Sequence, residues 1–113
     1  QFGKPISEFQ MIQERLAECQ ANYEAAANYV YNAAQAWDLG KLDSDSRSLS
    51  AKVKLFAAQM ATKVSLDAIQ ILGGYGYIKE FPVERYMRDA KLNEIGAGTN
   101  EILRVITARD MLA

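Results

Sequence analysis

The residues best suited to chemistry lie in one stretch, 70–99, where glycines alternate with charged and aromatic side chains. Five of the chain's seven glycines fall between Gly73 and Gly98. Glycine adopts backbone conformations that other residues avoid, and its missing side chain lets another group approach the main chain. Two interpretations are open at this point: close approach of a ligand to the backbone, or ordinary caps and turns between helices.

Three basic residues between the two glycine clusters offer a second kind of chemistry. They would bind an anionic ligand together, or they would form ion pairs with acidic neighbours on the same segment. The residue types favour neither interpretation over the other. The basic residues are Arg85, Arg88 and Lys91, and the acidic ones are Glu84, Asp89 and Glu94.

Composition excludes several other kinds of site. The chain has no histidine, which rules out Ser-His-Asp and Cys-His catalysis and histidine-bound metals. Its one cysteine, Cys19, rules out an internal disulfide and a cysteine-cluster zinc site, and its place on an apolar helix face predicts a small core residue. A net charge of −1 gives no reason to expect nucleic acid as a partner. No run of 18 apolar residues predicts a membrane span.

A long first helix is predicted from apolar residues that recur at alternating spacings of three and four. Ser7 followed by Gln10 fits a capping box at its start, and Gly40 is expected to end it. No proline interrupts the pattern, which implies one helix of about 30 residues. The members of this stripe are Phe9, Ile12, Leu16, Cys19, Tyr23, Ala26, Val30, Ala33 and Trp37.

A second long helix follows a short polar connection, 41–50. The cluster from Asp43 to Ser46 is typical of helix caps and lacks the spacing of a calcium loop. The short connection makes the two long helices antiparallel neighbours. Lysines are expected on a solvated face away from the apolar one. The apolar face comprises Val53, Ala57, Met60, Val64, Ala68 and Ile71, and the lysines are Lys52, Lys54 and Lys63.

The remaining segment is predicted to form a short helix and a final helix. Residues 75–81 are expected to form a compact loop, and Pro82 suits the first position of a helix. Residues 94–98 are expected to form a second glycine loop, and Thr99 suits the N-cap of the last helix, with Glu101 in its first turn. The fold class is therefore all-α: one domain, 1–113, built as an up-and-down bundle of two long antiparallel helices, a short helix and a C-terminal helix.

Three sequence motifs resemble one known family. The segments Gln-Ile-Leu-Gly-Gly-Tyr-Gly-Tyr from Gln70, Pro-Val-Glu-Arg-Tyr-Met-Arg-Asp-Ala-Lys from Pro82 and Gly-Thr-Asn-Glu-Ile from Gly98 closely resemble the C-terminal helical domain of acyl-CoA dehydrogenases. The opening residues 1–5 and the closing Ala108-Arg109 resemble the same family in the same order. In that family one more long helix precedes this segment. The resemblance therefore implies a piece of a longer protein, with an exposed apolar seam where the missing helix belongs.

The resemblance also implies an activity and a set of binding residues. In this family FAD takes a hydride from the β-carbon of an acyl-CoA while a carboxylate takes the α-proton, within a homotetramer whose electrons pass to electron-transfer flavoprotein. Small residues suit such a site, because bare backbone can approach a pyrophosphate and helix N-termini supply donors to anions. By resemblance, the FAD of a neighbouring subunit is contacted by Phe2, Gln70 and Gly74, the FAD of the same domain by Thr99 and Glu101, and CoA by Arg109.

Ala97 departs from the usual family pattern. Most members carry at this position the glutamate that serves as the base, and a methyl group cannot accept a proton. The segment 94–99 is most similar to that of isovaleryl-CoA dehydrogenases, whose base lies on the preceding helix. The resemblance therefore implies a short branched acyl-CoA as substrate, a catalytic carboxylate outside this chain and no activity for the chain alone. Glu94 is a poor candidate for the base, because it precedes the turn and suits an ion pair.

Two alternatives to this enzyme stay open. One is a non-catalytic helical module that kept the scaffold for oligomerisation or CoA binding. The other is a relative that uses the same flavin site for different chemistry. The expected location is the cytoplasm in a bacterium and the mitochondrial matrix in a eukaryote.

Overall fold

A computed structural model describes residues 1–42 and 46–113, and every regular element within them is helical. Asp43 to Asp45, in the predicted capping cluster, lie outside the described residues. The described part is elongated, with extents of 58 × 25 × 23 Å. Its elements in chain order are a 3-10 turn η1 (Ile6–Glu8), then α1 (Gln10–Asp38), α2 (Arg47–Leu72), α3 (Gly74–Tyr77), α4 (Val83–Ile95) and α5 (Asn100–Leu112).

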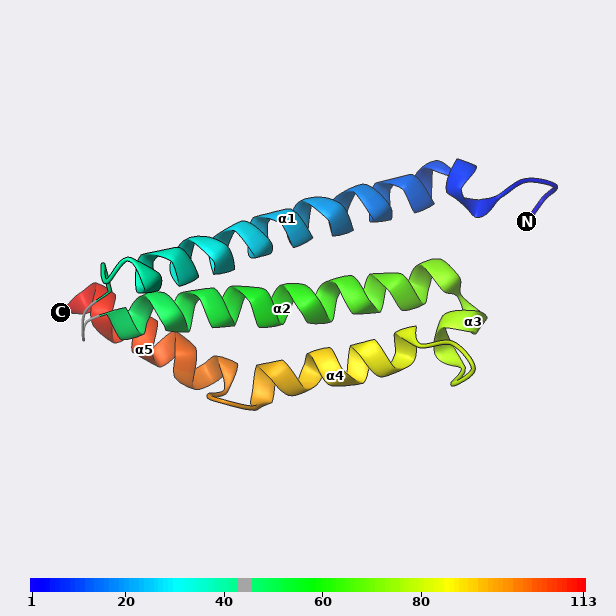
Figure 1. The fold of residues 1–113 in the computed structure, drawn as a ribbon. Helices are drawn as coiled ribbons and strands as arrows, with labels where there is room; N and C mark the ends of the chain where they lie inside the picture. The colour runs from blue at the N-terminus through cyan, green and yellow to red at the C-terminus, as the bar shows by residue number, and fades with distance from the viewer. Residues whose placement is uncertain (43–45) are drawn as a thin grey trace.

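Helix α2 is the central element of the bundle. Figure 1 shows α1 along one side of α2, while α4 and α5 follow one another along another side. The chain runs down α1, back along α2 and then returns through α4 and α5, so each long neighbour of α2 is antiparallel to it. The predicted all-α, up-and-down architecture is confirmed.

The start of α1 differs from the predicted capping box. Ser7 lies in the turn η1, and Phe9, which has an extended backbone, is the N-cap of α1 without a side-chain cap bond. Pro5, with φ −59°, starts η1 before the helix can begin, because proline has its φ fixed near this value. Gln13 donates from Nε2 to the Ser7 carbonyl oxygen at 2.9 Å. The capping-box prediction is therefore wrong.

The end of α1 follows the prediction. Gly40 has φ +63°, a left-handed conformation that glycine adopts without a Cβ penalty. Its N–H donates to the Trp37 carbonyl at 2.9 Å, and the Lys41 N–H donates to the Ala36 carbonyl at 3.0 Å. This pair of bonds is the Schellman motif, which satisfies carbonyls left without a partner at a helix end.

Two boundaries near the glycine clusters differ from the sequence prediction. The segment expected as a loop, 75–81, contains the four-residue helix α3. Helix α4 continues to Ile95, inside the predicted second glycine loop. Its length of 13 residues is the same as that of α5. Pro82 is the N-cap of α4 rather than its first residue. In both cases local backbone hydrogen bonding extends a helix into a segment that glycine and proline were expected to leave irregular.

Small residues dominate the core. The buried apolar residues include four alanines, and no large side chain is less than 2 % exposed among the described residues. Much of the long stripe on α1 is open to solvent: Trp37 is 69 % exposed and Tyr23 57 %. The predicted apolar seam is therefore present, because the spacing identified an apolar face that none of the residues 1–42 and 46–113 covers. The buried apolar residues are Ala26, Ala51, Val53, Ala58, Ala90 and Leu103.

Candidate functional site

The residues matched to cofactor and substrate positions fall into separate regions of the bundle. Gln70 and Gly74 lie where α2 meets α3, at the end of the molecule that also holds the amino terminus (Figure 1). Thr99 and Glu101 lie where α4 meets α5, and Arg109 lies in the last turn of α5. Helix α4 lies between the α2–α3 corner and the α4–α5 turn. At 1.5 Å per residue it is about 20 Å long, so these two regions are separated by a distance of that order.

The corner between α2 and α3 is built from glycines. Gly73, the C-cap of α2, has φ +59°, which a side chain would disfavour. Gly76 is buried directly against α2: a Cβ placed on it would lie 2.6 Å from the backbone oxygen of Ile69. At Gly73 and Gly74, in contrast, an added Cβ would meet nothing within 4 Å. The main chain there is therefore open to an approaching group.

An open depression of about 680 Å³ lies beside this corner. The amino-terminal segment forms part of its wall, so residues far apart in sequence meet there. Phe2 itself is 92 % exposed, and its ring packs edge-on against Phe9 at a centroid distance of 6.2 Å. The lining residues are Gln1, Ile6, Ile71, Leu72, Gly73, Gly74, Tyr75 and Ile78.

The second region is the turn between α4 and α5. Thr99 is the N-cap of α5, and its hydroxyl oxygen accepts a hydrogen bond from the Ile102 N–H at 3.3 Å, as predicted. Glu101 is exposed in the first turn, where a carboxylate interacts favourably with the helix dipole. It lies 3.6 Å from the Arg104 guanidinium.

Ala97 occupies a strained position in this turn. It is exposed and has φ +53°, and Gly98 beside it has φ +97°. A left-handed conformation costs a residue with a Cβ roughly 1–2 kcal/mol, and such strain persists only where the surrounding structure enforces it. The methyl group carries no proton acceptor, so the side chain at this position cannot act as a base.

Lys54 is a residue whose place the sequence reasoning missed. The sequence pattern predicts a solvated face for Lys54, but the side chain is half-buried and its ammonium contacts the turn between α4 and α5. It donates to the carbonyl oxygens of Asn93 at 2.5 Å, Gly96 at 2.9 Å and Gly98 at 2.7 Å. The available signal was weak: Lys54 is next to Val53, at the edge of the apolar face of α2.

Most of the basic residues that were candidates for an anion site are paired. Arg88 Nε donates to the Glu84 carboxylate at 3.0 Å, and Lys91 Nζ to Glu94 at 2.7 Å. The Arg85 guanidinium lies 5.7 Å from the centre of the Tyr86 ring. The structure therefore favours ion pairs over a shared anion patch for Arg88 and Lys91.

The same pair bears on Glu94 as a possible base. Its hydrogen bond from Lys91 is the main cause that lowers the pKa of this carboxylate below its ordinary value. A lowered pKa weakens a carboxylate as a proton acceptor. The ion pair therefore supports the sequence argument against Glu94 as the catalytic base.

Other candidate chemistry is weak in the described residues. Cys19 is half-buried, and burial is the main cause that raises the pKa of its thiol, which disfavours the reactive thiolate. No cluster of three or more histidine, cysteine, aspartate or glutamate residues suited to a metal ion occurs within 1–42 and 46–113. None of the helices described there is long and apolar enough to cross a membrane.

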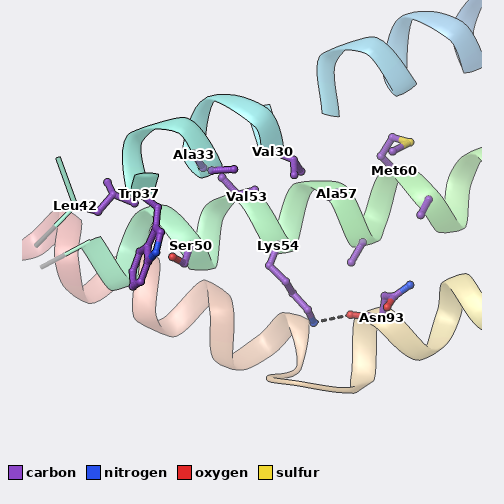
Figure 2. A pocket seen from close by; sticks show the side chains of 13 residues that line it. Val30, Ala33, Trp37, Leu42, Ser50, Val53, Lys54, Ala57, Met60 and Asn93 are labelled. Carbon is purple, nitrogen blue, oxygen red and sulfur yellow. Dashed lines mark hydrogen bonds between the residues drawn. The ribbon is translucent and has the colours of Figure 1, made fainter. Parts of the chain in front are cut away.

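A second apolar hollow lies between α1 and α2, with a volume of about 640 Å³. Figure 2 shows Trp37, Ala33 and Val30 from α1 facing Val53 and Ala57 from α2. Lys54 extends below this groove toward Asn93. The groove belongs to the uncovered apolar seam, and it offers shape and apolar surface rather than catalytic groups.

Comparison with known proteins places these regions in a family. Residues 1–112 match the profile described as acyl-CoA dehydrogenase, C-terminal domain. A mitochondrial isovaleryl-CoA dehydrogenase from Oryza sativa subsp. japonica is 52 % identical over 111 residues, which is 98 % of this chain and 26 % of that protein. The chain thus spans about a quarter of the length of the curated relatives it matches.

Solved structures agree in fold. Butyryl-CoA dehydrogenase from Megasphaera elsdenii superposes with a TM-score of 0.93 at 43 % identity, over 100 % of this chain and 29 % of that one. The FAD complex of PigA superposes with a TM-score of 0.88 at 32 % identity, over 98 % of this chain and 28 % of that one. With the profile matched almost from end to end, this chain belongs to the acyl-CoA dehydrogenase family and corresponds to its C-terminal helical domain.

Proposed function

We propose that this chain is the FAD-binding, tetramer-forming C-terminal domain of a flavin-dependent acyl-CoA dehydrogenase that oxidises a short branched acyl-CoA to the 2-enoyl-CoA. The observation that carries the proposal is the 52 % identity to an isovaleryl-CoA dehydrogenase over 98 % of the chain. The segment 94–99 also supports similarity to isovaleryl-CoA dehydrogenases, because it carries Ala97 where most family members have a glutamate.

The described residues fit a bound FAD. Gly73 and Gly74 leave the main chain open beside a depression, where a phosphate or ring edge could approach closely. The N-terminus of α5, capped by Thr99, offers backbone donors of the kind that bind anions. FAD, when bound, supplies the acceptor for the hydride that leaves the β-carbon of the acyl chain.

The separation of the two regions supports a shared site between subunits. Gln70 and Gly74 lie at the opposite end of α4 from Thr99. We propose that the first region contacts the flavin of a neighbouring subunit, together with Phe2, and that Thr99 and Glu101 contact the flavin of their own domain. The exposure of Phe2 suits such a contact, since most of its surface is open apart from the edge-on packing against Phe9.

The remaining roles concern CoA, the proton and the electrons. Arg109 is exposed in the last turn of α5, where its charge is free to meet the anionic CoA moiety. The α-proton goes to a carboxylate supplied from outside residues 1–113. Electrons are proposed to leave through electron-transfer flavoprotein, and the location is proposed to be the mitochondrial matrix in a eukaryote or the cytoplasm in a bacterium.

Anaerobic reduction of the bound flavin in the full-length protein tests the activity. Adding a short branched acyl-CoA is expected to bleach the flavin faster than adding a long straight-chain one. Absence of bleaching with every acyl-CoA, from a protein that still holds FAD, would favour the relative with different chemistry. A purified protein that holds no FAD and regains none on addition would favour the non-catalytic module.

Flavin content of two variants tests the site assignment. Gln70→Ala and Gly74→Val are expected to lower the FAD retained after purification, the first by removing a polar partner and the second by placing a branched side chain on open backbone. Gln59→Ala, on the exposed part of the same helix, is the matched control and is expected to retain FAD as the wild type does. Equal flavin content in all four proteins would refute the assignment of Gln70 and Gly74.

A further inference from the structure

The ammonium group of Lys54 joins the central helix to the turn at positions 96–98. Its three acceptors are main-chain carbonyl oxygens: Asn93 in the last turn of α4, then Gly96 and Gly98. They follow Lys54 by 39, 42 and 44 residues. Figure 2 shows the side chain reaching from α2 to Asn93.

The number of donors on Lys54 matches the number of acceptors around it. A lysine ammonium has three N–H donors, and each finds a carbonyl acceptor here. Carbonyls at the end of a helix lack intrahelical partners and carry the negative end of the helix dipole. A positive charge placed there forms charge-assisted hydrogen bonds, which are stronger than those between neutral groups.

Lys54 contacts the two carbonyls that flank the strained residue of the turn. Gly96 and Gly98 lie on either side of Ala97, whose φ of +53° is unfavourable for a residue with a Cβ. Backbone strain of this kind persists where surrounding contacts fix the chain on both sides. Gly98 is followed at once by Thr99, so the same contacts orient the first turn of α5.

The other lysines of α2 show that this arrangement is specific to Lys54. Lys52 Nζ lies 3.6 Å from the Asp110 carboxylate, and Lys63 contacts the carboxylates of Glu18 and Asp67 at 3.1 Å. Both are therefore pairs between side chains, which have their own rotational freedom. Lys54, in contrast, bonds to the backbone itself, so it restrains the path of the chain.

We propose that Lys54 is a positioning residue for the reaction: through the carbonyls around Ala97 it fixes the 96–98 turn and the N-terminus of α5 against the reacting acyl group and the flavin. The inference rests on the proposed function, which places Thr99 and Glu101, at and after the end of this turn, against the flavin. A displacement of about 1 Å in such a site can lower a rate on the order of a hundredfold. A lysine on the neighbouring helix α2, at least 39 residues away in sequence, would thus control the rate without touching the substrate.

Three variants of the full-length flavoprotein test this role. Lys54→Met keeps the alkyl stem but removes the ammonium, so a role limited to packing would survive the change. Lys63→Met is the matched control on the same helix, because it loses two side-chain ion pairs, neither of which involves the turn. Lys54→Arg restores a positive charge with hydrogen-bond donors and is expected to recover part of what Lys54→Met loses.

Two measurements are made on each variant. Hydrogen exchange of the backbone amides in 97–102 is expected to rise at least tenfold in Lys54→Met, with the amides of α1 as an internal reference. The limiting rate of anaerobic flavin reduction is expected to fall at least tenfold, while the acyl-CoA concentration for half that rate changes less than threefold. Lys63→Met is expected to leave both measurements within twofold of the wild type.

The outcomes separate this inference from the proposed function. Wild-type exchange in 97–102 and a wild-type limiting rate in Lys54→Met would overturn the inference. An equal rise of exchange in α1 and in 97–102 would also overturn it, because the effect would then be global unfolding. If the wild type holds FAD but no acyl-CoA reduces it, the proposed function fails, and the exchange data alone decide whether Lys54 holds the turn.

Discussion

The two glycine-rich corners of the molecule are fixed by opposite means. The α2–α3 corner depends on a missing side chain. Gly76 packs so closely against the Ile69 backbone that a Cβ on it would not fit. At the α4–α5 corner the decisive feature is a side chain that is present, Lys54, whose ammonium binds three carbonyls. Two similar glycine-rich sequences are therefore stabilised differently, one by close backbone packing and the other by hydrogen bonds from a lysine.

The difference matters for how each corner responds to change. A corner that depends on a glycine in close backbone contact is destabilised by any side chain at that position. The backbone atoms that the new Cβ meets can move only at a high energetic cost. At a corner that depends on an ammonium from another helix, we expect changes in the turn's own residues to be tolerated better, because the bonds go to main-chain carbonyls. Substitutions at the two corners should therefore differ in size and even in sign.

The largest expected effect is at Gly76. Gly76→Ala would place a Cβ 2.6 Å from the Ile69 oxygen and 2.8 Å from its Cα, so α3 must shift away from α2. Overpacking of this kind costs roughly 1–3 kcal/mol of unfolding free energy. Gly74→Ala, in the same short helix but with nothing within 4 Å of the new Cβ, is the control. Urea unfolding of the flavin-free full-length proteins measures both, and equal stabilities would contradict the packing argument.

A smaller effect of opposite sign is expected at the other corner. Ala97→Gly removes a left-handed strain of roughly 1–2 kcal/mol but adds roughly 0.5–1 kcal/mol of unfolded-chain entropy. The net result is a stabilisation of between about 0 and 1.5 kcal/mol. Ala108→Gly, the same change on the exposed surface of α5, is expected to destabilise by about 1 kcal/mol. Urea unfolding at a fixed protein concentration compares them, and a loss of stability in both would show that Ala97 is unstrained.

The smallest effect concerns the ion pair that precedes the α4–α5 corner. Because Lys91 lowers the pKa of Glu94 in the folded state, the pair contributes fully above the ordinary glutamate pKa. That contribution is lost as pH falls through the lowered folded-state value. Lys91→Met is thus expected to cost less than about 0.5 kcal/mol at neutral pH and nothing at low pH.

Thermal unfolding of the full-length protein at several pH values from 7 to 3 checks this sign. Lys79→Met, which removes the same charge from an exposed position outside α4, is the control for net charge. A difference between Lys91→Met and the wild type that grows as pH falls would contradict the assignment of the pair.

Sequence reasoning succeeded where a residue's own conformation or a short spacing decides the structure. Thr99 caps α5 through an atom three residues away, and Gly40 ends α1 through its own φ. It failed at Ser7, because Pro5 starts a 3-10 turn before the helix can use the serine as a cap. It also failed at Lys54, whose acceptors are at least 39 residues away and are visible only once α2 and α4 lie side by side.

The apolar stripe on α1 illustrates a further limit. A spacing of three and four residues identifies the apolar face of a helix but not what covers it. Ala26 is buried against α2, whereas Trp37 on the same stripe is open. The binding roles of the matched residues rest on resemblance, and measurements of flavin and CoA binding test them. These residues are Phe2, Gln70, Gly74, Thr99, Glu101 and Arg109.

The alanine-rich core and the open seam together leave much of this chain's surface exposed to solvent, which limits its folding free energy. A compact protein of 12.6 kDa exposes about 6,200 Å² to solvent by the usual scaling with mass. This chain exposes 8231 Å², an excess of roughly 2,000 Å², more than one partner contributes to a standard protein interface. Where another subunit covers part of that surface, as the proposed tetramer requires, the folding free energy is coupled by mass action to association, and dilution would lower it. Where the rest of the same polypeptide covers it, stability would not depend on concentration.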